Sequence, residues 1–85
     1  LGLVYKVFDD ASFAAEVQAF AARLAQGPAH AYRLMKRAVA DSFESPLDAQ
    51  LAREAELQQK AGSHPDFEEG VAAFREKRPP RFNPD

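Results

Sequence analysis

The residues best suited to chemistry lie near the C-terminus, where four cations fall within seven positions. Arg75, Lys77, Arg78 and Arg81 follow Phe74, which precedes Lys77 by one helical turn. Cations at the C-terminal end of a helix are favoured by the negative end of the helix dipole, each by about 0.3–1 kcal/mol. The same residues could instead hold a phosphate beside an apolar ligand group packed on the aromatic ring. The pattern alone leaves both interpretations open.

The remaining polar residues form no recognisable catalytic or metal-binding set. His30 and His64 lack a second ligand at a metal-binding spacing, so we predict no metal site. The carboxylate pairs fall at expected helix starts or on expected solvent faces, and no serine lies in a nucleophile-elbow motif. We therefore predict no catalytic residue in this chain. The acidic pairs are Asp9 with Asp10, Glu54 with Glu56, and Glu68 with Glu69.

The bulk composition excludes several classes of partner. The net charge of −2 over 85 residues argues against a nucleic-acid reader or a binder of anionic membranes. No apolar run approaches the roughly 20 residues needed to span a bilayer, so we expect no membrane partner. The absence of cysteine excludes a disulfide framework and fits a cytoplasmic location.

The elements that must position the basic cluster follow from periodicity and punctuation. Residues 2–8, GLVYKVF, are rich in β-forming residues and predict one short strand. Four helices are expected after it, with Asp9 and Asp10 as N-cap candidates for the first and Ser45 for the third. Gly70 falls inside the fourth helix, where glycine costs about 1 kcal/mol, so we expect a neighbour to pack against that turn. The expected helices span residues 11–26, 28–43, 46–61 and 64–77.

Each expected helix carries a short, alanine-rich apolar stripe. Such stripes bury little area, and at about 25 cal/mol per Å² the resulting core would be marginal alone. We therefore expect the chain to lean on another domain or subunit. The stripes are Phe13, Val17, Phe20, Ala21 and Leu24; Ala31, Leu34, Met35, Ala38 and Val39; Leu47, Leu51, Ala55 and Leu57; and Phe67, Val71 and Phe74.

Several segments resemble the C-terminal portion of the crotonase (enoyl-CoA hydratase/isomerase) superfamily, both in amino-acid sequence and in their order along the chain. The most specific is D-x-x-E-G-V-x-A-F-x-E-K-R-x-P-x-F, from Asp66 to Phe82. The run AELQQKAG is similar to the branch of ring-1,2-epoxyphenylacetyl-CoA isomerases in phenylacetate degradation. The other matching segments are GLVYKVF, LAQGPAHAYRLMKRAV and FESPLDAQLAREAELQ.

The resemblance implies a mainly α fold, namely the C-terminal helical trimerisation domain of a crotonase (ClpP/crotonase-like) enzyme. Residues 1–8 would be the last strand of a missing spiral core, and residues 9–85 would form the helical domain. That core would supply the oxyanion-hole N–H groups and the acid–base carboxylates. The chain alone is then expected to be inactive, whereas the complete enzyme would form a homotrimer or a hexamer.

The resemblance also assigns a ligand and two residues that contact it. Phe74 matches the aromatic residue that borders the acyl-CoA pocket, and Lys77 matches the lysine that contacts the phosphate and adenine end of CoA. Acyl-CoA is thus implied as a substrate, with no permanently bound cofactor. The implied activity is isomerisation of epoxyphenylacetyl-CoA. The alternatives are an enoyl-CoA hydratase of fatty-acid β-oxidation and a stand-alone helical interaction module without activity.

Overall fold

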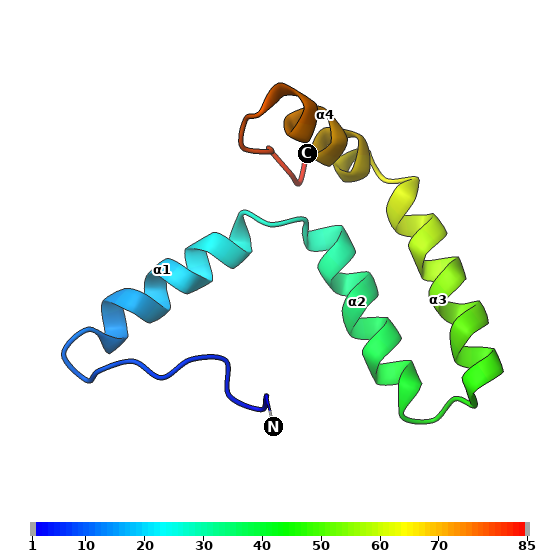
Figure 1. Ribbon diagram of the computed structural model, residues 1–85, viewed down its shortest axis with the longest axis horizontal. Helices are drawn as coiled ribbons and strands as arrows, with labels where there is room; N and C mark the ends of the chain where they lie inside the picture. The colour runs from blue at the N-terminus through cyan, green and yellow to red at the C-terminus, as the bar shows by residue number, and fades with distance from the viewer. Residues whose placement is uncertain (1, 85) are drawn as a thin grey trace.

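Four α-helices account for most of the chain in the computed structural model, which describes residues 2–84 (Figure 1). Every predicted helix is confirmed, and each boundary lies within two residues of its predicted place. The periodic apolar residues and the Gly-Pro punctuation therefore sufficed to locate the helices. The helices are α1 (Phe13–Ala25), α2 (Ala29–Ser42), α3 (Leu47–Gly62) and α4 (Pro65–Glu76).

The predicted N-terminal strand is wrong for the chain as described. Residues 2–8 form no ladder, because no other segment among residues 2–84 pairs with them. They run beside α1 instead, where Tyr5 stacks on Phe20 with 5.0 Å between ring centroids. Phe8 meets Phe13 edge-on at 6.4 Å. Leu1, the first residue of the predicted strand domain, and Asp85, the last residue of the predicted helical domain, lie outside the described residues.

Two of the predicted helix caps are also wrong. Ser12, not Asp9 or Asp10, occupies the N-cap of α1, and its hydroxyl donates to the Glu16 carboxylate at 2.9 Å. Pro46 takes the N-cap place of α3 that the sequence assigned to Ser45, and it offers no side-chain acceptor. In both cases the helix begins later than predicted, so the expected capping residue falls one or more positions too early.

At α4, His64 occupies the N-cap position. The Nδ1 atom of His64 accepts a hydrogen bond from the backbone N–H of Asp66 at 3.1 Å, and Pro65 occupies the first helical position. Proline is well placed there because its missing N–H would have had no partner within the helix.

The best-packed part of the molecule is the hairpin of α2 and α3, which run antiparallel and are joined at residues 43–46 (Figure 1). Leu34 and Leu57 are its buried side chains, 6% and 4% exposed. Gln50 Nε2 donates to the Ala38 carbonyl at 3.0 Å. α4 packs against α3 and buries Ala73, which is 2% exposed.

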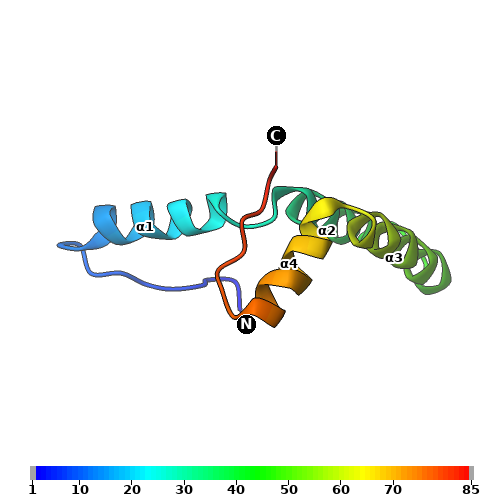
Figure 2. The same ribbon diagram turned by 90° about the horizontal axis from the view of Figure 1, so that it is seen from above.

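The overall shape is open rather than compact. The radius of gyration is 16.3 Å, against about 12 Å for a compact chain of this length. α1 stands away from the other helices in both views (Figures 1 and 2). No helix within residues 2–84 is long and apolar enough to cross a membrane.

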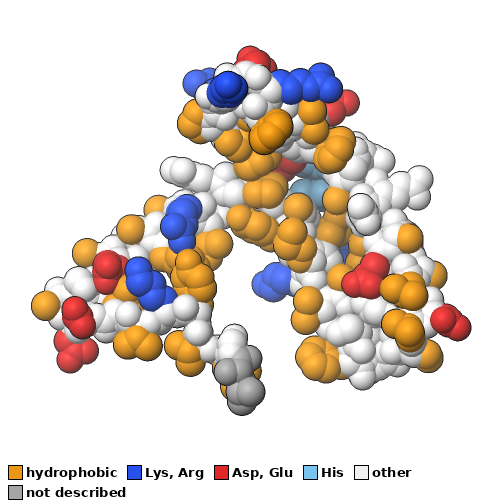
Figure 3. Space-filling view, in the orientation of Figure 1, with side chains coloured by type: hydrophobic (Ala, Val, Ile, Leu, Met, Phe, Trp, Pro, Cys, Tyr) orange, Lys and Arg blue, Asp and Glu red, His pale blue; other side chains and the backbone are white. Residues whose placement is uncertain are grey.

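Most of the predicted core stripes are therefore exposed, which corrects the expectation that they pack inward within this chain. The space-filling view shows hydrophobic side chains gathered along the hollow between the arms of the molecule (Figure 3). The described residues cover these faces only in part, so the helical period is correct while most of the expected burial is not. The large exposed residues of the stripes are Phe13, Val17, Leu24, Met35, Val39, Leu47, Leu51, Phe67 and Phe74.

Candidate functional site: an apolar groove beside the fourth helix

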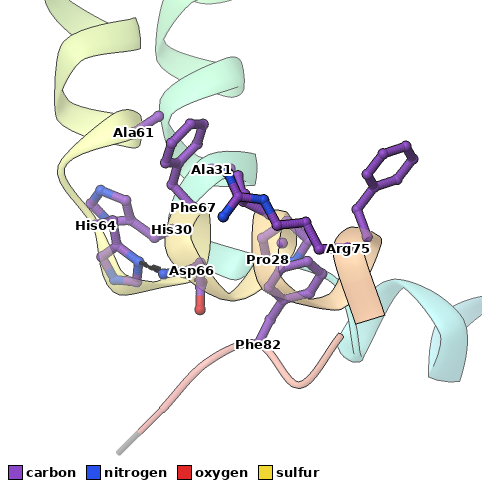
Figure 4. Close-up of a pocket in the computed structure, with 12 residues that line it drawn as sticks. Pro28, His30, Ala31, Ala61, His64, Asp66, Phe67, Arg75 and Phe82 are labelled. Atoms are coloured by element: carbon purple, nitrogen blue, oxygen red, sulfur yellow. Dashed lines mark hydrogen bonds and ion pairs between the residues drawn. The ribbon is translucent and has the colours of Figure 1, made fainter. Parts of the chain in front are cut away.

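An apolar groove of about 520 Å³ lies between α4 and the beginning of α2 (Figure 4). Its floor comes from α4 and the end of α3, and the C-terminal tail closes one side. Most of its wall is apolar, so the groove suits a hydrophobic or aromatic group. The lining residues are Pro28, His30, Ala31, Ala61, His64, Asp66, Phe67, Gly70, Val71, Phe74, Arg75 and Phe82.

Phe82 lies against Gly70, where the sequence predicted an unspecified neighbour. Its ring lies 3.7 Å from the position that a Cβ atom would take on Gly70. That distance is an ordinary van der Waals contact, so a methyl group would fit there. The contact expected at this turn is thus confirmed, although nothing within the described residues requires a glycine.

The residues of the basic cluster have different roles, and the role of Arg78 is structural. Its guanidinium makes two hydrogen bonds to the Glu69 carboxylate, at 2.7 and 3.0 Å. The same carboxylate accepts the backbone N–H of Arg81 at 2.7 Å. These bonds, that of Arg78 first, lower the pKa of Glu69 to about 2. Glu69 thus pairs with the charge of Arg78. By bonding to Arg78 and Arg81, it also ties the tail to α4.

Lys77 and Phe74 lie together at the end of α4 but face different surroundings. Phe74 lines the groove and is 86% exposed. Lys77 is exposed and does not line the groove, and its ammonium pairs with no carboxylate among residues 2–84. Its backbone has φ 54°, in the left-handed region. The two residues of the predicted pair therefore differ in position, since Phe74 lines the groove and Lys77 does not.

The left-handed turn at Lys77 closes α4. The N–H of Lys77 donates to the carbonyl of Phe74 at 3.3 Å, and the N–H of Arg78 donates to that of Ala73 at 3.1 Å. This pattern is a Schellman motif, whose left-handed position is usually glycine. A lysine there costs about 1–2 kcal/mol. The turn directs the chain after Lys77 back across α4.

The two histidines, distant in sequence, meet at the other end of the groove (Figure 4). The rings of His30 and His64 stack with centroids 4.1 Å apart and 10° between planes. Desolvation, and then the neighbouring His64, lower the pKa of His30. Asp66 beside them is only 6% exposed, and its Oδ2 atom has no hydrogen-bond partner. Within residues 2–84 no three metal-ligating side chains cluster.

Sequence reasoning missed Asn83, which holds the tail to the start of α2. Its side-chain amide bonds to Gly27 and Ala29, which are 56 and 54 residues earlier in the chain. No local pattern connects residues so far apart. The groove as a whole can hold an apolar group, and its polar lining residues are His30, His64, Asp66 and Arg75.

Comparison with known proteins gives one consistent result. The family model described as Enoyl-CoA hydratase/isomerase matches residues 1–85. A probable enoyl-CoA hydratase of Rhodobacter capsulatus is 46% identical over 82 residues, which cover 96% of this chain and 32% of that protein. The 1,2-epoxyphenylacetyl-CoA isomerase of Escherichia coli is 38% identical over 81 residues, covering 95% and 31%.

A solved structure agrees with these relatives. The crystal structure of an enoyl-CoA hydratase from Geobacillus kaustophilus superposes with a TM-score of 0.81 at 34% identity. The superposition covers 96% of this chain and 31% of that one. The chain thus spans about a third of the length of the proteins that it matches.

Proposed function

Because the chain belongs to the enoyl-CoA hydratase/isomerase family, we propose that it is the C-terminal helical part of a longer enzyme that acts on acyl-CoA thioesters. The observation that carries this proposal is the family match over all 85 residues. The TM-score of 0.81 to an enoyl-CoA hydratase supports the same assignment. Activity is proposed for the complete polypeptide, to which this chain contributes binding surface and no catalytic residue.

We propose that Phe74 and Lys77 form one wall of the acyl-CoA site. Phe74 offers an exposed aromatic face at the groove, suited to the apolar part of the thioester. Lys77 offers a positive charge in reach of solvent, suited to a phosphate of CoA. The ion pairs of Arg78 with Glu69 and Glu76 support Lys77, rather than Arg78, as the phosphate partner.

Two reactions remain open for the complete enzyme. Isomerisation of 1,2-epoxyphenylacetyl-CoA is supported by the 38% identity to the enzyme of that name. Hydration of an enoyl-CoA is the second candidate, and it is favoured by the higher identity, 46%, to a probable hydratase. Assaying the complete enzyme with a 2-enoyl-CoA and with the epoxide, side by side, separates them by the ratio of kcat/KM.

We further propose that the complete enzyme is a cytoplasmic homo-oligomer, a trimer or a hexamer. The exposed apolar stripes support this, since continuous faces of such residues are normally covered. The alternative of a stand-alone interaction module is not favoured, because a family of enzymes matches the whole chain.

The site assignment is tested by titrating the complete enzyme with a CoA thioester. Phe74→Ala should weaken binding about 5- to 10-fold, because aromatic packing of about 1 kcal/mol is lost. Phe43→Ala is the matched control, since Phe43 is just as exposed but does not line the groove. Equal affinities for the two variants would reject Phe74 as part of the site.

A further inference from the structure

Asn83 joins three parts of the chain that are far apart in sequence. Its Nδ2 donates to the Gly27 carbonyl at 2.8 Å, and its Oδ1 accepts the N–H of Ala29 at 2.9 Å. Its own backbone N–H donates to Asp66 Oδ1 at 2.9 Å. The tail, the turn between α1 and α2, and the first turn of α4 are thus tied at one residue.

An asparagine is suited to this place for two physical reasons. The backbone of Asn83 has φ 62°, a left-handed conformation that asparagine tolerates better than most residues. Its amide carries a donor and an acceptor, and both are used. The acceptor also replaces a missing cap: Pro28 occupies the N-cap of α2 and provides no side-chain acceptor for the helix N–H groups.

The tail has a second anchor on the other side of Phe82. Glu69 accepts the backbone N–H of Arg81 at 2.7 Å and pairs with Arg78. Phe82 therefore lies between two fixed points, with its ring against Gly70. On the other side of the Asn83 contact, Gly27 and Ala29 flank Pro28, which also lines the groove. The Glu69 anchor and the Asn83 contacts thus hold two walls of one cavity, namely Phe82 and Pro28.

We propose that Asn83 is a positioning residue for the groove: its amide holds Phe82 and Pro28 in place as two walls of the space for the apolar acyl group of a CoA thioester. The choice of occupant rests on the function proposed above. The hydrogen bonds themselves do not, so the clamp can be tested separately from the ligand. Asn83 touches no ligand in this account and acts through the two walls that it holds.

The test is Asn83→Gly in the complete enzyme. Glycine keeps the left-handed backbone and the N–H to Asp66, and removes only the amide. Amide hydrogen exchange at Ala29 should accelerate roughly 3- to 10-fold, because one hydrogen bond is lost. The KM for a thioester with a bulky acyl group should rise by about 5-fold and by more than kcat falls, with acetyl-CoA affinity changing less. Arg81→Gln is the control, because only the backbone of Arg81 bonds to Glu69.

Unchanged exchange at Ala29 would overturn the clamp. The proposal would also be overturned if Asn83→Gly left the thioester affinity unchanged while Phe74→Ala lowered it. If affinity responds to neither variant while exchange at Ala29 accelerates, the proposed acyl-CoA wall has failed and the clamp itself stands. If Asn83→Gly does not fold, Asn83→Asp keeps the acceptor for Ala29, replaces the donor to Gly27 by an oxygen that repels that carbonyl, and adds a negative charge near Asp66. It should raise the KM about 2- to 3-fold, and no change would overturn the proposal.

Discussion

Residues 29–84 and residues 2–25 are both rich in helix and both carry apolar stripes, yet they are held in different ways. The first region has three buried apolar side chains, Leu34, Leu57 and Ala73. In addition, hydrogen bonds of Glu69 and Asn83 stabilise it. In the second, no residue of α1 is buried. Its contacts with residues 2–8 are aromatic stacking and one long hydrogen bond, from Arg23 to the Tyr5 hydroxyl at 3.5 Å.

The difference shows what an amphipathic pattern can and cannot specify. A helical period tells which residues share a face, whereas burial depends on what lies opposite that face. For residues 29–84 the opposite surface is partly in this chain. For α1 the described residues cover only part of the apolar face, through Tyr5 and Phe8.

The largest expected effect comes from the same substitution made in each region. Leu57→Ala should lower the free energy of unfolding by about 2–5 kcal/mol, because it opens a cavity between α2 and α3. Leu24→Ala in α1 should cost less than about 1 kcal/mol, since Leu24 is 46% exposed. Urea denaturation of this 85-residue chain measures both. Equal costs would mean that α1 is packed as firmly as the hairpin.

A second expected effect is a pH dependence to which Glu69, in the C-terminal region, contributes most. The pKa of Glu69 is lowered from 4.5 to about 2, so its stabilising bonds are complete above pH 4.5 and are lost as the pH falls towards 2. Thermal melts of the chain from pH 6 to pH 2 should therefore show a falling Tm. In Glu69→Gln this part of the fall should be absent. A variant with the same pH profile as the parent would show that Glu69 does not hold the tail.

A smaller gain is expected at the end of α4. Lys77→Gly should stabilise the chain by up to about 1 kcal/mol, because glycine adopts the left-handed turn without strain. Lys77→Ala keeps the strain and loses the same charge, so its stability should stay close to that of the parent. If the two variants melted at the same temperature, the left-handed turn would not form in solution.

The smallest effect is expected at Gly70. Gly70→Ala should raise stability by less than about 1 kcal/mol, since alanine favours a helix and its methyl group meets Phe82 at an ordinary distance. The comparison of Tm in this chain and in the complete enzyme gives the check. A gain in the chain with a loss in the enzyme would place another part of the protein against this turn.

Sequence reasoning located all four helices to within two residues, because helix boundaries depend on residues within a few positions of one another. That margin was still too wide to identify the N-caps of α1 and α3. Sequence reasoning failed where partners are distant. Asn83 binds Gly27 and Ala29 across more than 50 residues, and no local signal marks that pairing. It also failed for residues 2–8, since a strand forms only with a partner strand.

For the site, the sequence singled out Phe74 and Lys77 but not the groove around them. The groove arises from side chains on three helices and the tail, whose packing cannot be derived from the spacing along α4. The different roles of Arg78 and Lys77 could not be predicted from the sequence either, because they depend on the contact of Glu69 with Arg78 across the end of the helix.

The most direct test of the acyl-CoA wall pairs Lys77 with the phosphate that we propose it contacts. The affinity of the complete enzyme is measured for an acyl-CoA and for the same acyl-dephospho-CoA, in the parent enzyme and in Lys77→Gln. For the parent enzyme, removal of the 3′-phosphate should lower the affinity about 3- to 5-fold at low salt. For Lys77→Gln, the same removal should leave the affinity almost unchanged. Equal losses in the two enzymes would contradict the assignment of Lys77 to the CoA phosphate.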